Sequence, residues 1–308
     1  MLKKRGGMII TLLIFFIVSI LIIFFNKSSK TVENSNFINN NVRVSSFEAI
    51  PNDNVDDTLA IQMAINVVGN KGGGTVIFSE GVYLIDAVKS IKLKDNINLQ
   101  FNKDTILKAL PNDKSSYEII EIHDVENVSI KGNAVIEGER KEHTGTTGEW
   151  GMGISIRGSE NIHLENLTVR DCWGDGIYIG STEKKNFNKN ITIENSILEN
   201  NRRQGISVIS AINLKIVNPI VKDTRGTSPE SGIDLEPNEP TDRLQNIEIN
   251  NPSTENNKGF GILIFLENLK NSPHPVSITV KNTKNVKDDI QIVKPDYVKG
   301  TVKTIIVK

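Results

Sequence analysis

The chain has 308 residues, with 36 basic and 37 acidic side chains, a net charge of −1 and a single cysteine. A charge this close to zero excludes bulk electrostatic attraction to nucleic acid, so we expect no nucleic-acid partner. The lone Cys172 excludes an intrachain disulfide, so stability has to come from packing.

The first 26 residues predict a membrane segment. Three positive charges in MLKKRGG precede Met8–Phe25, a run without any charged residue that is long enough to cross a bilayer. No small-residue cleavage site follows, and basic residues stay on the cytoplasmic side. We therefore expect a single-pass anchor in the cell membrane over residues 1–26, with the bulk of the chain extracellular. The alternative is a cleaved signal and a secreted protein.

Residues 27–46 begin with KSSKTVENSNFINNN, a polar composition typical of a flexible stalk. Residues 47–308 are then predicted to form one domain, long enough to bury a sizeable core. Near its start, Asn54–Asn70 has apolar residues at helical spacing behind acidic capping residues, which predicts a helix. KGGGTVIFSEGVYLI, Lys71–Ile85, predicts two strands joined by a turn.

Two short patterns recur in alternation along the remaining chain. Asn-apolar-x-apolar begins at residues 127, 161, 190, 213 and 246, and Gly-Ile-x-apolar begins at 153, 176, 205, 232 and 261, with the variant DIQI at 289. A strand of this kind buries its apolar side only by stacking coil on coil, which indicates a solenoid with parallel strands. A leucine-rich repeat would need a denser leucine pattern. The fold class is therefore predicted as all-β, a right-handed parallel β-helix, with the N-terminal helix covering the open end of its first coil.

DDTLAIQMAI followed by GGGTVIFSEGVYLI resembles the opening of the pectate-lyase-like β-helix superfamily, which includes rhamnogalacturonases and polygalacturonases. The resemblance extends from Phe47 to the C-terminus. It implies a β-helix and a polysaccharide as substrate, without specifying one reaction.

Polygalacturonases of this superfamily carry their catalytic residues on one sheet, in the register of the Gly-Ile strands. Only the second residue of the family's Asp-Asp pair is kept, as Asp175, and the resemblance therefore does not extend to polygalacturonase chemistry. The family has four such elements, which are Asn-Thr-Asp, Asp-Asp, Gly-His-Gly and the substrate-binding Arg-x-Lys. In chain order, they align with Gly151-Met152, Gly174-Asp175, Arg203-Gln204-Gly205 and Asp234-Leu235-Glu236.

Alginate C5-epimerases of this fold carry Tyr-Gly-Phe/Ile-Asp-Pro-His. Gly232-Ile233-Asp234 is similar to the centre of that motif, with Ser231 in place of the Tyr and Glu236 in place of the His. Both resemblances imply that the outer face of the Gly-Ile sheet is where a site would lie.

Alternation along each Gly-Ile strand sends the residue two after the glycine outward. Stacked coils about 4.8 Å apart then form a column. Polar residues gather in its middle coils, which predicts a bounded polar patch. The column reads Ser155, Tyr178, Ser207, Asp234 and Leu263.

Asp234 and Glu236 lie on the same strand face, with an expected separation of about 7 Å. Inverting glycosidases hold their two carboxyl groups about 6.5–9.5 Å apart, and mutual repulsion would make one an acid and the other a base. We predict this pair as catalytic. The alternatives are a solvated acidic face without function, and a Ca²⁺ site completed by Asn238.

Asp175 and Gln204 occupy one column on adjacent coils, more than about 10 Å from Asp234 by column counting. This position predicts sugar-binding residues. Arg203 stands at the same edge and would hold an anionic sugar, or abstract a proton in a lyase. Its alternative is a surface ion pair.

The longest interruption between early coils, Ile136–Gly153, is predicted to fold over the patch. It supplies His143 as an acid/base candidate, Glu149 as a binding residue, and Trp150 as an aromatic face for a sugar ring. Trp150 would alternatively cover the edge of a coil. No metal-ligand spacing links the histidines, so no metal site and no cofactor is expected apart from the Ca²⁺ alternative.

We therefore expect a membrane-anchored extracellular enzyme that cleaves an acidic polysaccharide, with hydrolysis preferred over elimination. The alternatives are a glycan-binding or scaffold β-helix without catalysis, and a uronate epimerase or lyase.

Overall fold

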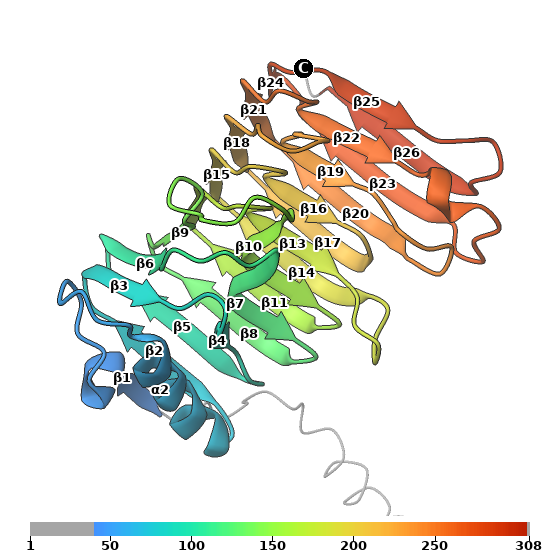
Figure 1. Cartoon of the computed structure of the whole chain (residues 1–308). Coiled ribbons are helices and arrows are strands. Elements are labelled where there is room, and N and C mark those ends of the chain that lie inside the picture. Colours follow the sequence, from blue (N-terminus) through green and yellow to red (C-terminus); the bar gives the residue numbers. More distant parts are fainter. Residues whose placement is uncertain (1–39, 307–308) are drawn as a thin grey trace, which may run out of the picture. The chain divides into compact units, whose positions relative to one another are not determined.

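Parallel strands dominate residues 40–306, the part of the chain that this computed structural model describes. In this part, every strand pairing is parallel, and three sheets run side by side along the solenoid (Figure 1). The predicted parallel β-helix is therefore confirmed. The predicted anchor, residues 1–26, and most of the predicted stalk lie outside the described residues. Within residues 40–306, no helix has the length and apolar character needed to span a membrane.

Sheet A contains the Asn-apolar-x-apolar strands. Its order is β1 (Asn41–Arg43), β2 (Gly74–Phe78), β5 (Ile97–Phe101), β8 (Glu126–Lys131), β11 (Glu160–Glu165), β14 (Asn188–Glu194), β17 (Ala211–Val217), β20 (Leu244–Asn250), β23 (Val276–Lys281) and β26 (Gly300–Ile305).

Sheet C contains the Gly-Ile strands, and sheet B the short strands that follow sheet A in each coil. Sheet C runs β4 (Ile91–Lys92), β7 (Ser116–His123), β10 (Trp150–Arg157), β13 (Ile177–Gly180), β16 (Ile206–Val208), β19 (Ile233–Leu235), β22 (Ile262–Phe265) and β25 (Ile290–Val293). Sheet B runs β3 (Gly81–Ile85), β6 (Thr105–Ala109), β9 (Val135–Glu137), β12 (Thr168–Arg170), β15 (Ile197–Glu199), β18 (Ile220–Lys222), β21 (Ser253–Glu255) and β24 (Asn285–Val286).

The first coil begins earlier than the sequence predicts. β1 pairs in parallel with β2, and the 3₁₀ helix η1 (Val44–Phe47) follows it directly. Residues 41–46 thus belong to the β-helix and not to a stalk. Their backbone groups complete the edge of sheet A, a pairing that the polar composition of the segment does not reveal.

The N-terminal helix α2 (Thr58–Asn70) buries Ile61, Ala64, Ile65 and Val68 in the core. The predicted cap over the first coil is confirmed, and the helix begins directly after the acidic residues predicted to cap it. Asp57 does not cap it by its side chain. The Asp57 carboxylate instead accepts the backbone N–H groups of Ile50 and Leu84 at 3.0 and 3.1 Å, which fastens the entering chain to β3.

The core is a stack of aligned isoleucines from the Gly-Ile strands. The glycines next to them are needed because there is no room for a side chain. A Cβ on Gly205 would lie 2.2 Å from Val221 Cγ1 and 2.5 Å from the carbonyl oxygen of Gly232. Each coil therefore bends tightly enough to bring sheet B against sheet C. The aligned residues, all fully buried, are Ile154, Ile177, Ile206, Ile233 and Ile262.

The repeated asparagines stabilise a turn rather than a site. Asn161, for example, has a φ of 58°, donates to Asn127 Oδ1 at 3.0 Å and accepts from Asn190 Nδ2 at 2.9 Å. Asn tolerates this left-handed backbone better than other non-glycine residues. The ladder continues through Asn213 and Asn246 with bonds of 2.9 Å.

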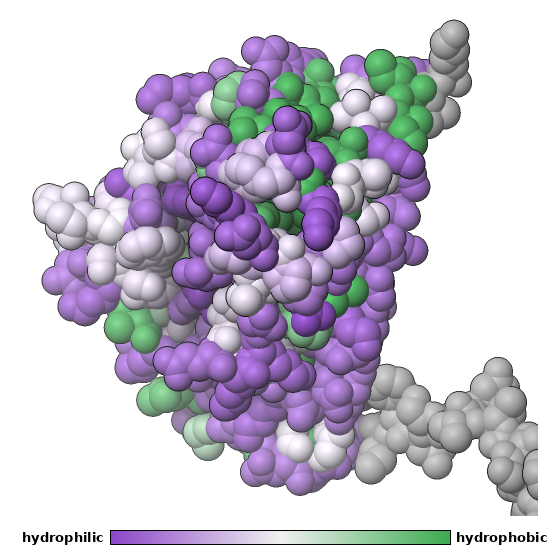
Figure 2. All heavy atoms as spheres, turned by 90° about the vertical axis from the view of Figure 1, so that its right-hand side faces the viewer, coloured by the Kyte–Doolittle hydropathy of each residue, from purple (hydrophilic) through white to green (hydrophobic). Residues whose placement is uncertain are grey.

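Most of the molecular face viewed in Figure 2 is hydrophilic, and hydrophobic side chains gather mainly toward the C-terminal coils at its top. Exposed apolar residues of those coils include Ile292, Ile305 and Ile306.

Candidate functional site

The outward column of sheet C is formed as predicted. Ser155, Tyr178, Ser207, Asp234 and Leu263 are register partners on successive strands. Ser207 and Asp234 are almost completely buried, although both point away from the core. The column is therefore not an open strip of polar groups, because neighbouring side chains cover it.

Asp234 is hydrogen-bonded to Gln204 of the preceding coil. Gln204 Nε2 donates a 2.6 Å hydrogen bond to Asp234 Oδ2, and Gln204 Oε1 accepts the backbone N–H of Ser231 at 2.8 Å. This second bond fixes which end of the Gln204 amide faces the acid. The separation of more than about 10 Å expected for Gln204 and Asp234 is wrong, because column counting neglected the reach of a glutamine side chain.

Burial raises the pKa of Asp234 well above its usual value, the negative charge of Glu236 raises it further, and Arg203 opposes both effects. Among the residues that the structure describes, Asp234 Oδ1 is buried without a hydrogen-bond partner. The separation of about 7 Å expected for the two carboxyl groups from strand geometry stays a prediction.

The guanidinium of Arg203 lies among three carboxyl groups, those of Glu236, Asp175 and Glu149. Its Nη1 lies 3.3 Å from Asp175 Oδ2, its Nη2 3.9 Å from Glu236 Oε2 and its Nε 3.7 Å from Glu149 Oε2. Burial lowers the pKa of Arg203, but the surrounding carboxylates, Asp175 first, outweigh it and raise the pKa overall. Arg203 is thus the cation at the centre of an acidic cluster, and not an isolated surface ion pair.

Asp175 lies at the inner side of this cluster. It is fully buried and accepts a 2.8 Å hydrogen bond from the hydroxyl of Ser207. Burial raises its pKa, and Arg203 opposes the shift. Asp175 and Asp234 both act on the guanidinium of Arg203, so the expectation that Asp175 is remote from the catalytic pair is also wrong. Asp175 therefore positions Arg203 from the inner side of the cluster, and its side chain is not exposed for contact with a sugar.

The accessible groups of the cluster are Glu236 and Glu149, whose side chains are 31% and 34% exposed. Glu149 comes from the loop before β10, as the sequence predicts, and Trp150 follows it with 46% exposure. Two carboxyl groups thus border the same guanidinium, and the exposed indole follows one of them in the chain. Such a surface suits a sugar, whose hydroxyls bond carboxylates and whose ring stacks on an indole.

His143 is not part of this surface. Its side chain is fully buried, Nδ1 lies 3.0 Å from Glu139 Oε1, and its ring stacks on Trp173 with centroids 3.9 Å apart. Glu139 is also hydrogen-bonded to Tyr117. The prediction of His143 as an acid/base residue over the patch is therefore wrong in this structure, because aromatic rings from two coils enclose it.

The sequence reading missed Glu139 as the buried partner of His143. Burial raises the pKa of Glu139 to about 7, and burial lowers the pKa of His143. The spacing of the two residues, four apart in IEGERKEH, was the available signal. Their role is to hold the loop in place, together with Arg202, which stacks over Trp173 at 3.8 Å and donates to the carbonyl of Gly148 at 3.0 Å.

Asn238 lies after β19 and is exposed. Its backbone N–H donates to Asp242 Oδ2 at 2.9 Å, which fixes the turn that leaves the site. Among residues 40–306, no group of three or more His, Cys, Asp or Glu side chains is arranged to hold a metal ion. A Ca²⁺ at Asp234 and Glu236 would compete with the Arg203 guanidinium, and it stays a prediction.

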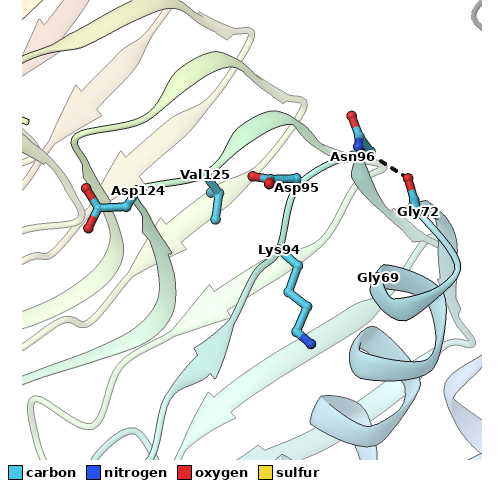
Figure 3. A pocket seen from close by; sticks show the side chains of 7 residues that line it. All are labelled: Gly69, Gly72, Lys94, Asp95, Asn96, Asp124 and Val125. Atoms are coloured by element: carbon cyan, nitrogen blue, oxygen red, sulfur yellow. Dashed lines mark hydrogen bonds between the residues drawn. The ribbon is translucent and has the colours of Figure 1, made fainter.

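Two hollows of about 360 Å³ lie away from the acidic cluster. The first, beside the C-terminal end of α2, is bordered by Lys94, Asp95 and Asp124 (Figure 3). The second lies on sheet A and is lined by Asn190, Asn213 and Lys215, among others. The labelled side chains in Figure 3 spread over separate turns and do not converge on one point.

A comparison with known protein families agrees with the observed fold. The chain matches the family model described as right handed beta helix region over residues 77–235, and it belongs to that family. The handedness expected from the sequence and the pectate-lyase-like type of the fold are thereby confirmed.

Two proteins of Bacillus subtilis (strain 168) are similar in sequence. The uncharacterized protein YclG is 29% identical over 213 residues, which covers 61% of this chain and 36% of YclG. The SPbeta prophage-derived uncharacterized protein YorA is 28% identical over 184 residues, covering 51% and 31%. The aligned region is therefore about a third of the length of these relatives.

Solved structures of low sequence identity share the fold. An iota-carrageenase complexed to iota-carrageenan fragments has a TM-score of 0.60 and 20% identity, covering 78% of this chain and 53% of that one. A putative glycosyl hydrolase from Parabacteroides merdae ATCC 43184 has a TM-score of 0.54 and 22% identity, covering 70% and 95%. The tailspike protein of E. coli bacteriophage HK620, in complex with a pentasaccharide, has a TM-score of 0.56 and 14% identity, covering 86% and 49%.

Proposed function

We propose that this chain is a polysaccharide-cleaving enzyme that works on the outer face of sheet C, with hydrolysis as its reaction. The single observation that carries the proposal is the pairing of a buried carboxyl group, Asp234, whose pKa is raised by burial, with the accessible Glu236 two residues on, next to the Arg203 cation. A carboxyl group that keeps a proton at neutral pH is what a general acid requires. β-Helix proteins of similar fold that act on or bind polysaccharides support the substrate class.

Glu236 is the residue we assign to direct contact with the glycosidic oxygen, because Asp234 is 1% exposed and Glu236 is 31% exposed. Asp234 would supply and retrieve the proton from behind. Glu149, on the other side of Arg203, would orient a water for attack on the sugar. Such a pair of carboxyl groups with unequal environments is the usual arrangement for glycoside hydrolysis.

Elimination is less well supported. In a lyase, Arg203 would have to give up a proton in order to abstract one next to the sugar carboxylate. The carboxylates around Arg203 raise its pKa, so they oppose the neutral form that a base needs. Arg203 is better suited to holding the carboxylate or sulfate of an acidic sugar. An acidic polysaccharide therefore remains the expected substrate.

Products distinguish the reactions. The purified protein is incubated with a panel of acidic and neutral polysaccharides. New reducing ends without the ultraviolet absorbance of an unsaturated uronate support hydrolysis, and that absorbance would establish elimination. A changed uronate composition at constant chain length would establish epimerisation.

A glycan-binding protein without catalysis is the second candidate. The observation that favours it is the neutralisation of the acidic cluster by Arg203, which makes the arrangement self-sufficient. Binding of a glycan that is never turned over, and that persists in Glu236→Gln, would decide for this candidate.

The location of the enzyme is part of the proposal. The uncharged run Met8–Phe25 behind Lys3, Lys4 and Arg5 supports a membrane anchor with the β-helix outside the cell. Protease treatment of intact cells that carry a C-terminal tag tests this. Loss of the tag supports the extracellular position, and a tag released into the medium without protease would show cleavage of the N-terminal segment.

A further inference from the structure

Three side chains on β7 and β10 form a chain of contacts outside the acidic cluster. Ser155 Oγ lies 3.0 Å from His123 Nε2, and the other ring nitrogen of His123 lies 3.4 Å from Glu121 Oε1. Strand register produces this arrangement. Ser155 is the direct partner of Glu121, and Arg157 is the direct partner of His123, so all four side chains face outward at one place on sheet C.

Arg157 limits the directions of these hydrogen bonds. Its Nε donates to Ser155 Oγ at 2.9 Å, and because arginine has no acceptor, the hydroxyl proton of Ser155 is available to His123 Nε2, with the Glu118 carboxylate as the other acceptor within reach. Burial lowers the pKa of His123 to about 4, against the opposing charge of Glu121. The imidazole is therefore neutral, accepts at Nε2 and carries its proton on Nδ1 toward Glu121.

We propose that Ser155, His123 and Glu121 are the nucleophile, general base and orienting acid of an esterase site that removes acyl groups from sugar hydroxyls. The Ser155 oxygen bonds to the acyl carbon as its proton passes to His123. The bond from the acyl carbon to the sugar oxygen then breaks, and His123 returns the proton to that oxygen. Water hydrolyses the acyl-serine by the same path and releases the carboxylic acid.

Arg157 supplies the group that the carbonyl oxygen needs during attack. Its guanidinium lies 4.3 Å over the ring of Tyr178 and 3.5 Å from Glu118. Ser155 is completely buried, whereas the Arg157 side chain is 24% exposed. When an acyl group enters, its carbonyl oxygen accepts the Arg157 N–H that Ser155 Oγ accepts in this structure. The rotation of Arg157 exposes the Ser155 hydroxyl and places a cation next to the developing oxyanion.

The esterase site and the acidic cluster lie on one face. Ser155 and Asp234 belong to the same column, on β10 and β19, separated by β13 and β16. Three strand spacings correspond to about 14 Å, a length that one glycan chain bridges. The sugar nature of the substrate rests on the proposed function, but the reactivity of Ser155 does not.

The test uses a fluorophosphonate probe, which labels activated serines, together with hydrolysis of p-nitrophenyl acetate by the purified protein. We expect labelling of the folded wild type that is lost in Ser155→Ala, and a fall in hydrolysis of about 100-fold in His123→Gln. Ser129→Ala is the matched control. Ser129 faces His163 across β8 and β11, but its hydroxyl is hydrogen-bonded to Asn98 instead.

Labelling absent from the folded wild type, or unchanged in Ser155→Ala, would overturn the proposal. Thermal unfolding of each variant identifies misfolding, and His123→Gln provides the second measurement if Ser155→Ala does not fold. Glu236→Gln separates the two sites, since it is expected to keep ester hydrolysis while losing chain cleavage. Release of acetate from an acetylated polysaccharide would identify a sugar ester as the substrate. If the protein hydrolyses p-nitrophenyl acetate but releases no acetate from the polysaccharide, only the assignment of a sugar substrate is overturned.

Discussion

Gln204 and Asp234 lie on neighbouring coils of sheet C and are joined by a hydrogen bond of 2.6 Å. Because Gln204 is itself held by the backbone of Ser231, this bond fixes the orientation of an acid whose pKa is raised by burial. The neighbouring Glu236 is 31% exposed. The acidic cluster thus has two layers, a buried one with Asp234 and Asp175 and an exposed one with Glu236 and Glu149.

Replacing the surface acid tests this division. Glu236→Gln is expected to lower polysaccharide cleavage by about 100-fold or more, because the proton held by Asp234 then has no carboxylate through which to reach the substrate. The measurement is the rate of formation of reducing ends at saturating glycan. Glu248→Gln is the control, since Glu248 lies on sheet A and pairs with Lys281. Equal rates for wild type and Glu236→Gln would refute the assignment.

Protonation of Asp234 also predicts how stability depends on pH. Burial raises its folded-state pKa above the usual 3.8. Its contribution to stability is therefore fully present below about 3.8 and is lost as pH rises through the folded-state pKa. Asp234→Asn mimics the protonated form and is expected to melt about 2–4 °C above the wild type near pH 8, the shift that ~1 kcal/mol produces in a domain of this size.

Thermal unfolding from pH 4 to pH 8 measures this effect, and the difference between the two proteins should shrink toward the acidic end. Asp113→Asn serves as control, because Asp113 is exposed. An Asp234→Asn protein that melts lower than the wild type near pH 8 would contradict a raised folded-state pKa for Asp234.

The exposed indole of Trp150 is expected to contribute to glycan binding and not to folding. Trp150→Ala should weaken binding about three- to tenfold, the loss of one stacking contact, with an unchanged melting temperature. Binding is measured by calorimetry on the Glu236→Gln background, which prevents turnover. Ile220→Ala removes a similarly exposed apolar side chain from sheet B. Equal affinity of Trp150→Ala and Ile220→Ala would place the sugar elsewhere.

The asparagine ladder makes a prediction about stability. Asn161→Ala loses two side-chain hydrogen bonds and places alanine at a φ of 58°, for a total cost of about 2 kcal/mol. Asn161→Gly loses the same bonds but tolerates the backbone angle, so it should cost about 1 kcal/mol less. Urea unfolding gives both values. Equal losses would mean that the backbone angle contributes nothing.

The repeat made the fold predictable. Each Gly-Ile strand and each Asn strand has the same apolar spacing, and every coil repeats the requirement that its inner face be covered by the next. The glycine of the motif reflects a local contact, as Gly205 against Val221 illustrates. Patterns with such local causes are visible in the chain itself. The start of the first coil at Asn41 was missed because pairing with β2 depends on backbone bonds that composition does not record.

The site was predictable as a set of columns but not as a set of contacts. Strand register placed Ser207 beside Asp234 as expected. The lengths and rotamers of Gln204, Arg203 and Glu236 determined which groups touch, and column counting ignores both. His143 was assigned to the surface because it lies in a polar loop, whereas Trp173, from another coil, encloses it.

By itself, the sequence determined the parallel β-helix, the helix that closes its first coil and the sheet on which polar residues gather, since apolar period and turn residues act over a few positions. The tertiary structure decided that Arg203 stands at the centre of the acids, that burial raises the pKa of Asp234 and that Ser155 contacts His123. Each of these depends on burial and on side-chain distances between coils, which about 30 intervening residues separate in sequence.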